Sequence, residues 1–247
     1  VYSSTEALQL AHEHPHEEVV FFAIGFETTA PANALSVLKA KELKVKNYST
    51  LVSQMRVPPA ICAILNDPHN RVQGFLAAGH VCAVMGFHEY IPLADKFHLP
   101  IIVTGFEPLD LAMGILETIK ALEKHWHGVI NAYPRAVTKE GNQNAQEIIH
   151  RVYEPCDQKW RGIGIIPNSG WKLNADFADY DAEKRFEVEK IQTKESEICI
   201  AGLILQGRKK PSECPAFGSL CTPENPLGAT MVSSEGTCAA YYHYQRK

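Results

Sequence analysis

Four cysteines near the end of the chain have a spacing that could hold a metal centre. Cys199, Cys214, Cys221 and Cys238 follow the pattern C-x14-C-x6-C-x16-C. Four thiolates can bind a tetrahedral zinc ion or an iron–sulfur cluster. Structural zinc sites usually contain two close pairs of cysteines, and no such pair occurs here, so the even spread favours a cubane cluster. Four unligated thiols in a segment rich in proline and glycine are the weaker alternative.

Acidic and hydroxyl side chains follow two apolar runs. The motif GFETT places Glu27 and Thr28 after one run, and GFEPLD places Glu107 and Asp110 after another. In open α/β sheets, ligand sites form at the carboxyl ends of the strands. The alternative is that each acidic residue only stabilises the start of the next helix, with Thr28 or Thr29 as its N-cap. Because the pattern occurs twice, we interpret these residues as candidate site residues.

Three further residues have side chains suited to a functional site. His80, in the tripeptide GHV, could relay a proton or bind a metal near neutral pH, and a hydrogen-bonded turn histidine is an equal alternative. Trp160 and Arg161 could close a cleft or support a contact between domains. Their alternatives are packing for the tryptophan and an ion pair for the arginine.

Apolar runs and helical patterns alternate at short intervals over the first 150 residues. Strands are expected at 19–26, 47–54, 74–86 (running into a turn), 100–106 and 128–133. Helices are expected at 5–14, 31–44, 58–67, 88–98 (broken), 108–125 and 142–154. This alternation is typical of βαβ units and a parallel sheet covered by helices. We therefore predict an α/β fold with Rossmann-like domains and a small loop-rich C-terminal unit.

Two of these segments also predict which side chains are buried. The run VVFFAIGF at 19–26 is continuously apolar, which predicts a strand buried on both faces. The helix at 108–125 places Leu109, Ala112, Leu116 and Ile119 on one apolar face.

Composition excludes several classes of protein. The 247 residues are 45% apolar and 21% charged, as in an ordinary globular chain, and the net charge is −4. No basic stripe supports nucleic-acid binding, and no apolar run is long enough to span a membrane. Seven cysteines without a secretory signal argue for thiols used in metal or redox chemistry.

Several motifs occur in an order that resembles the HypD family of hydrogenase maturation proteins. They are GFETTAP, GHV, GFEPLD, WRGIGIIPNSG, and then CTP and MVSSEGTCAAYY with the four-cysteine spacing. The resemblance covers the whole chain. It implies two α/β domains of similar build and a small iron–sulfur domain.

The resemblance also implies a function and a cofactor. Family members are cytoplasmic and assemble the iron centre of [NiFe]-hydrogenases, an Fe(CN)2CO unit, together with HypC and HypE. They carry a [4Fe-4S] cluster, whose ligands would be Cys199, Cys214, Cys221 and Cys238. The cluster would supply electrons to a thiol/disulfide site that holds iron transiently. Such a protein is an assembly factor with redox chemistry rather than a turnover enzyme.

The chain departs from the family pattern in one large respect. The family motifs CGGHTH and GPGCPVC, whose cysteines are thought to hold the iron, are absent from these residues. We therefore expect the chain to begin after them, so that most of the transient iron site lies in a missing part. Two smaller departures are Ala78, where many members have proline, and Cys82, where serine is common.

These observations predict a division of the chain. Residues 1–18 are expected to be a linker or helix from a truncated first α/β domain, and 19–130 an α/β domain. Residues 131–190 would connect and partly complete the truncated domain, and 191–247 would form the cluster domain. The alternative function is a zinc-binding α/β interaction or ligand-binding module without redox activity. A stand-alone metabolic enzyme has no phosphate loop, GxGxxG or Ser/His/Asp motif in its favour.

Overall fold

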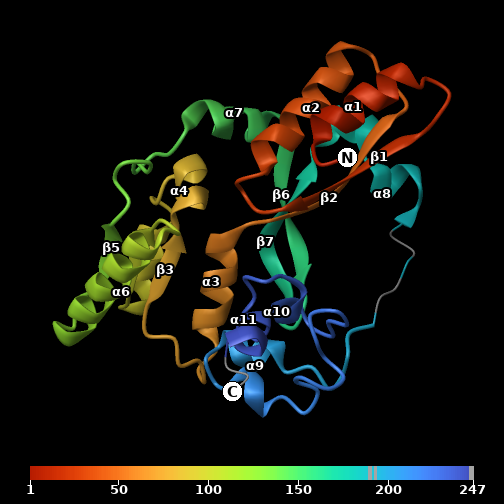
Figure 1. Cartoon of the computed structure of the whole chain (residues 1–247). Helices are drawn as coiled ribbons and strands as arrows, with labels where there is room; N and C mark the ends of the chain where they lie inside the picture. Colours follow the sequence, from red (N-terminus) through yellow and green to blue (C-terminus); the bar gives the residue numbers. More distant parts are fainter. Residues whose placement is uncertain (189–190, 192–193, 245–247) are drawn as a thin grey trace. The chain divides into compact units, whose positions relative to one another are not determined.

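The chain forms two compact units that interleave along the sequence (Figure 1). The computed structural model describes residues 1–188, 191 and 194–244. The first unit comprises Val1–Pro59, Gln73–Cys156 and Asn168–Ile191, and the second comprises Ala60–Val72, Asp157–Pro167 and Gln192–Lys247.

The first unit contains a mixed four-stranded sheet. Its strands are β1 (Val19–Gly25), β2 (Tyr48–Met55), β7 (Gly164–Leu173) and β6 (Tyr153–Trp160), in the order β1-β2-β7-β6. β1 and β2 pair in parallel, and β2 pairs with β7 in the antiparallel direction. The ends of β6 and β7 that meet at their connecting turn belong to the second unit.

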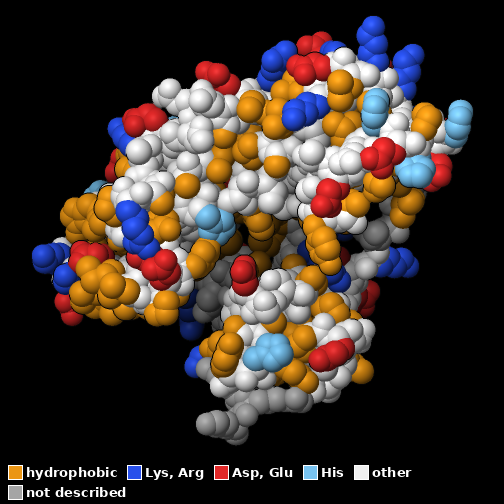
Figure 2. All heavy atoms as spheres, turned by 45° about the horizontal axis from the view of Figure 1, so that its top comes forward, with side chains coloured by type: hydrophobic (Ala, Val, Ile, Leu, Met, Phe, Trp, Pro, Cys, Tyr) orange, Lys and Arg blue, Asp and Glu red, His pale blue; other side chains and the backbone are white. Residues whose placement is uncertain are grey.

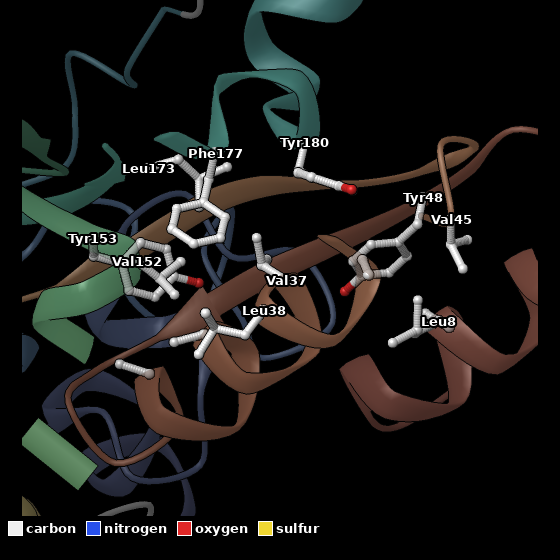
Figure 3. Close-up of a cluster of buried hydrophobic side chains, with 14 of the residues drawn as sticks. Leu8, Val37, Leu38, Val45, Tyr48, Val152, Tyr153, Leu173, Phe177 and Tyr180 are labelled. Atoms are coloured by element: carbon white, nitrogen blue, oxygen red, sulfur yellow. The ribbon is translucent and has the colours of Figure 1, made fainter. Parts of the chain in front are cut away.

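Helices pack on this sheet around a continuous apolar core. They are α1 (Ser4–Glu13), α2 (Ala30–Glu42) and α7 (Gln143–Val152), followed by a short 3-10 helix η1 (Ala175–Tyr180) and α8 (Ala182–Arg185). The local sequence explains where α1 and α2 begin, because Ser3 accepts a hydrogen bond from the Glu6 N–H and Pro31 lies in the first turn of α2. Figure 3 shows side chains from the helices and from the sheet meeting in one cluster that includes Leu8, Val37, Tyr48, Tyr153 and Phe177.

A second, parallel sheet also lies in the first unit. It consists of β3 (Phe75–Ala78), β4 (Pro100–Thr104) and β5 (Gly128–Asn131), with β4 in the centre. All five residues of β4 are buried. The connecting helices are α4 (Gly79–Met85), α5 (Tyr90–Phe97) and α6 (Pro108–Glu123). The predicted α/β class with parallel, Rossmann-like pairing is therefore confirmed.

The burial of β1 differs from the prediction. Val20, Phe22 and Ile24 are 45%, 54% and 62% exposed, so only alternate side chains are covered. Among the described residues, β1 is the edge strand of its sheet and pairs with β2 alone. An apolar run therefore indicated a strand correctly, but the expectation that both faces are buried was wrong.

The orientation of α6 also differs from the apolar pattern. Leu109 is 73% exposed, and Ala112, Leu116 and Ile119 are exposed with it. Figure 2 shows hydrophobic side chains at the surface on the side where Figure 1 places α6. The helix instead approaches the sheet through Gly114, where an added Cβ would lie 3.1 Å from the Thr104 side chain. The face of α6 that packs on the sheet is therefore the one with a small residue at the contact, not the one with the most hydrophobic side chains.

One further local prediction needs correction. Residues 74–86 were expected to form a strand running into a turn, but the strand ends at Ala78 and the helix α4 starts at Gly79. His80 consequently lies in the first turn of a helix.

The second unit has little regular structure. It contains most of α3 (Val57–Asn66), with α9 (Ala201–Leu205), the 3-10 turn η3 (Pro211–Glu213), α10 (Ala229–Val232) and α11 (Thr237–Tyr244). One apolar cluster in this unit has the buried members Ile204, Ala216, Cys221, Met231, Cys238 and Ala239. None of the helices in the described part of the chain has the length and apolar content needed to cross a bilayer.

Candidate functional site

The four C-terminal cysteines lie around one pocket in the second unit. Cys199 precedes α9, Cys214 follows η3, Cys221 lies in a loop, and Cys238 is in the first turn of α11. All four are free thiols, Cys221 and Cys238 buried and the other two half-buried. The remaining wall is largely apolar and includes Ile200, Ile204, Phe217 and Met231.

Neighbouring groups donate hydrogen bonds to two of the sulfurs. The Leu227 N–H donates to Cys221 Sγ at 3.4 Å, and the Thr230 hydroxyl donates to Cys238 Sγ at 3.0 Å. Such donors lower the energy of a thiolate and of a metal-bound sulfur. Gly228 brings the backbone against the Cys199 sulfur, and a Cβ at this position would overlap that atom.

Burial raises the pKa of the Cys238 thiol, and the Thr230 hydrogen bond only partly opposes this effect. The other three cysteines raise it further, because their negative charges would repel a fourth thiolate. A cationic centre would reverse this balance, since metal ligation requires the thiolate. Four convergent thiols, apolar walls and donors to sulfur therefore suit a cluster ligated by four cysteines. Within residues 1–188, 191 and 194–244, no three His, Cys, Asp or Glu side chains are grouped as a site for a single metal ion.

Glu27 occupies the carboxyl edge of the mixed sheet, directly after β1. Its side chain is 2% exposed, and Oε1 accepts a hydrogen bond from the Val57 N–H at 2.8 Å. Oε2 has no hydrogen-bond partner among the described residues. Burial raises the pKa of this carboxyl to about 7, although Arg56 acts in the opposite direction. Thr28 is half-buried in the following turn.

Thr28 or Thr29 was expected to cap the helix that follows this turn, and Thr29 does occupy the N-cap position. Thr29 is the residue before α2, but its side chain makes no capping hydrogen bond. Its hydroxyl instead donates to the Phe26 carbonyl at 3.2 Å and pairs with the Gln54 amide. Thr29 thus connects the ends of β1 and β2.

Cys82 and Tyr90 are buried close enough to Glu27 to interact with it electrostatically. Burial raises the pKa of the Cys82 thiol to about 12, despite a hydrogen bond with Tyr90. Cys82 is therefore protonated at neutral pH and is not an activated nucleophile.

Glu107 and Asp110 lie at the carboxyl edge of the other sheet, next to a cation that sequence reasoning missed. Arg135 donates two hydrogen bonds to Asp110, at 2.7 and 2.6 Å, and lies 3.4 Å from Glu107. These hydrogen bonds lower the pKa of Asp110. Arg135 follows β5, so the strand-end rule that selected the two acidic residues would have found it as well.

His80 belongs to this second edge. It is exposed on α4, and its ring centroid lies 4.7 Å from that of Phe106. The predicted edge residues are thus divided between two sheets, with Glu27 and Thr28 on one and His80, Glu107 and Asp110 on the other. The helix α4 carries His80 towards one edge and Cys82 towards Glu27.

Trp160 and Arg161 lie in the second unit with the cysteines. Trp160 is half-buried. Arg161 Nη2 donates to the Leu227 carbonyl at 3.0 Å. Glu195, also missed in the sequence, accepts a hydrogen bond from the Gly162 N–H at 3.0 Å and pairs with Lys159 at 3.3 Å.

Comparison with known proteins agrees with the motifs. The family model HypD, described as "Hydrogenase formation hypA family", matches residues 1–245. Hydrogenase maturation factor HypD1 of Bradyrhizobium diazoefficiens is 43% identical over 253 residues, which cover 100% of this chain and 67% of that protein. The HypD proteins of Cupriavidus necator and Escherichia coli are 42% and 40% identical, with 100% of this chain and 67% and 66% of those proteins covered. This chain therefore belongs to the HypD family of hydrogenase maturation factors.

Proposed function

We propose that the second unit holds a [4Fe-4S] cluster on Cys199, Cys214, Cys221 and Cys238. The observation that carries the proposal is that four thiols from separate segments line one apolar pocket. When bound, such a cluster would supply single electrons for hydrogenase maturation.

The surrounding residues would stabilise the sulfurs and exclude water. The Leu227 N–H and the Thr230 hydroxyl would disperse negative charge on Cys221 and Cys238. Two of the four ligand positions are buried, so solvent has little access to those sulfurs. These groups would keep the thiolates ligated and set the reduction potential.

We further propose the role that the resemblance implies for the longer protein. It would act in the cytoplasm with HypC and HypE and would carry iron as cargo during assembly of the Fe(CN)2CO centre. The cysteines proposed to hold that iron belong to motifs absent from these 247 residues. Glu27 would serve this reaction as a proton-exchanging group, since its buried carboxyl titrates near neutral pH.

The cluster is tested by anaerobic purification and iron–sulfide analysis of the 247-residue chain. We expect a brown protein that absorbs near ~400 nm, with about four iron atoms and about four sulfides per chain. Replacing any one of the four cysteines with alanine should abolish or strongly reduce this cluster. Cys62→Ala is the matched control, because Cys62 lies in the same unit outside the pocket.

Two results would contradict the proposal. One is a colourless wild-type chain that binds one zinc ion, which would favour the zinc-binding alternative. The other is a normal cluster in the Cys214→Ala variant, which would remove that residue from the ligand set.

A further inference from the structure

The turn between β6 and β7 contacts the loops that carry the cysteines. We call residues 160–163 the β6–β7 turn, and it is closed by a hydrogen bond from the Ile163 N–H to the Trp160 carbonyl at 3.0 Å. At its tip, Arg161 donates to the Leu227 carbonyl at 3.0 Å. This charge-assisted hydrogen bond joins residues that are 66 positions apart in the sequence.

The segment held by Arg161 approaches two of the four sulfurs. The Leu227 carbonyl oxygen accepts the hydrogen bond from Arg161, and the Leu227 N–H donates a hydrogen bond to Cys221 Sγ. The next residue, Gly228, lies against Cys199 Sγ so closely that no Cβ fits. Arg161 therefore fixes a short stretch of backbone that contacts Cys221 on one side and Cys199 on the other.

A second set of contacts holds the same turn to the start of α9. Gly162 has a φ of +86°, and a Cβ there would lie 3.2 Å from the Ala201 side chain. A Cβ on Gly202 would in turn overlap the Gly162 carbonyl oxygen. Glu195 accepts the Gly162 N–H and pairs with Lys159 on β6. Since α9 begins two residues after Cys199, these contacts fix the segment that carries this ligand.

We propose that the β6–β7 turn is a clamp that pre-positions the cysteine pocket, with Arg161 as its positioning residue. The clamp holds the backbone of residues 227–228 and the start of α9 at fixed places beside Cys199 and Cys221. The thiols are thereby oriented before any metal binds. The part of this inference that concerns cluster retention rests on the proposed cluster, whereas the part that concerns thiol orientation does not.

The first measurement uses the metal-free, reduced chain. Arg161→Gln should increase the rate at which iodoacetamide alkylates Cys199 and Cys221, measured residue by residue by mass spectrometry. We expect roughly a five-fold increase, the change that follows the loss of one net hydrogen bond from the closed form. Cys62, a half-buried thiol of the same unit outside the pocket, is the internal reference.

A matched variant separates position from charge. Arg208→Gln removes the same charge from an exposed arginine of the same unit, whose guanidinium donates a hydrogen bond to the Gln206 side-chain oxygen at 3.4 Å. It should leave the alkylation rates unchanged. Glu195→Ala should increase the rate at Cys199 through the other side of the clamp, and circular dichroism verifies that each variant is folded.

The second measurement uses the cluster-loaded chain. Loss of visible absorbance in air or with a chelator should be several-fold faster in Arg161→Gln than in wild type or Arg208→Gln. Wild-type alkylation rates in both folded Arg161→Gln and Glu195→Ala would overturn the clamp. If Arg161→Gln changes the alkylation rates but wild type binds no cluster, the clamp stands and the proposed cofactor fails.

Discussion

At the scale of single residues, Glu27 combines deep burial with incomplete pairing. One carboxylate oxygen accepts a backbone hydrogen bond and the other has no partner among the described residues. Removal from water disfavours the charged form more strongly than Arg56 favours it. The carboxyl is therefore half-protonated near neutral pH in the folded chain.

Glu27→Gln should change how stability depends on pH. The folded-state pKa of about 7 lies above the ordinary value of 4.5, so the folded chain binds the extra proton between these values. The wild-type free energy of unfolding should therefore lose a contribution as pH rises from about 4.5 to about 7, and this contribution stays lost above pH 7. The glutamine variant has no carboxyl to titrate, so its free energy of unfolding lacks this loss. The free energy of unfolding of the variant minus that of wild type should therefore be about 3 kcal/mol larger at pH 8 than at pH 4.5.

Urea unfolding of both proteins at several pH values measures this difference. Glu123→Gln, which changes an exposed carboxyl on α6, is the control and should follow the wild-type profile. Parallel profiles for wild type and Glu27→Gln would show that Glu27 has an ordinary pKa in the folded chain.

The sequence identified acidic site residues better than it identified their partners. Glu27, Glu107 and Asp110 were recognisable because each follows an apolar run that forms a strand. The ion pair of Asp110 with Arg135 spans 25 positions and requires β4 and β5 to be neighbours. No local pattern carries that information, because sheet order is decided by tertiary packing.

At the scale of elements, the hydrophobic periodicity of the sequence predicted where helices and strands lie, but not which of their faces are buried. Helical patterns and strand-forming runs predicted α2, α6 and β4 close to their observed ranges. The face that α6 presents to the sheet was not predictable from its apolar residues, because Gly114 allows the closest approach to Thr104. The exposure of one face of β1 could not be predicted from its sequence either, because it depends on which other elements pack against that face of the sheet.

Two substitutions test this account of α6. Leu109→Ser should change the free energy of unfolding by no more than about 0.5 kcal/mol, because the side chain is mostly exposed. Ile102→Ala in the buried strand β4 should cost about 2–5 kcal/mol, the range for removing a fully buried side chain. Chemical denaturation compares the two, and a similar loss in both variants would show that the Leu109 face is packed.

At the scale of the whole molecule, the two units differ in what can stabilise them. The first has two sheets and a broad apolar cluster (Figure 3). The second has short helices, and one of its apolar clusters includes the proposed ligands Cys221 and Cys238. Bound metal would thus add to the stability of this unit, because it would join the segments that carry its ligands.

Cluster removal should therefore loosen one unit selectively. Anaerobic chelation of the loaded chain should speed amide hydrogen exchange in α9 and α11, whereas the amides of β4 should stay protected. The control is the same treatment of Cys214→Ala, in which no cluster remains to be lost. Equal exchange in α9 before and after chelation would show that the second unit is stable without the cluster.

The interleaving of the units also constrains the order of events during synthesis. Ala60–Val72 and Asp157–Pro167 leave the ribosome well before Gln192–Lys247, although all three segments build the same unit. Two of its three segments are therefore synthesised before the segment that carries the four cysteines, while the strands of the first unit are already available to pair. The cysteine pocket is consequently completed after every strand of the first unit has been synthesised, and iron can be captured by all four thiols only once Cys238 has emerged.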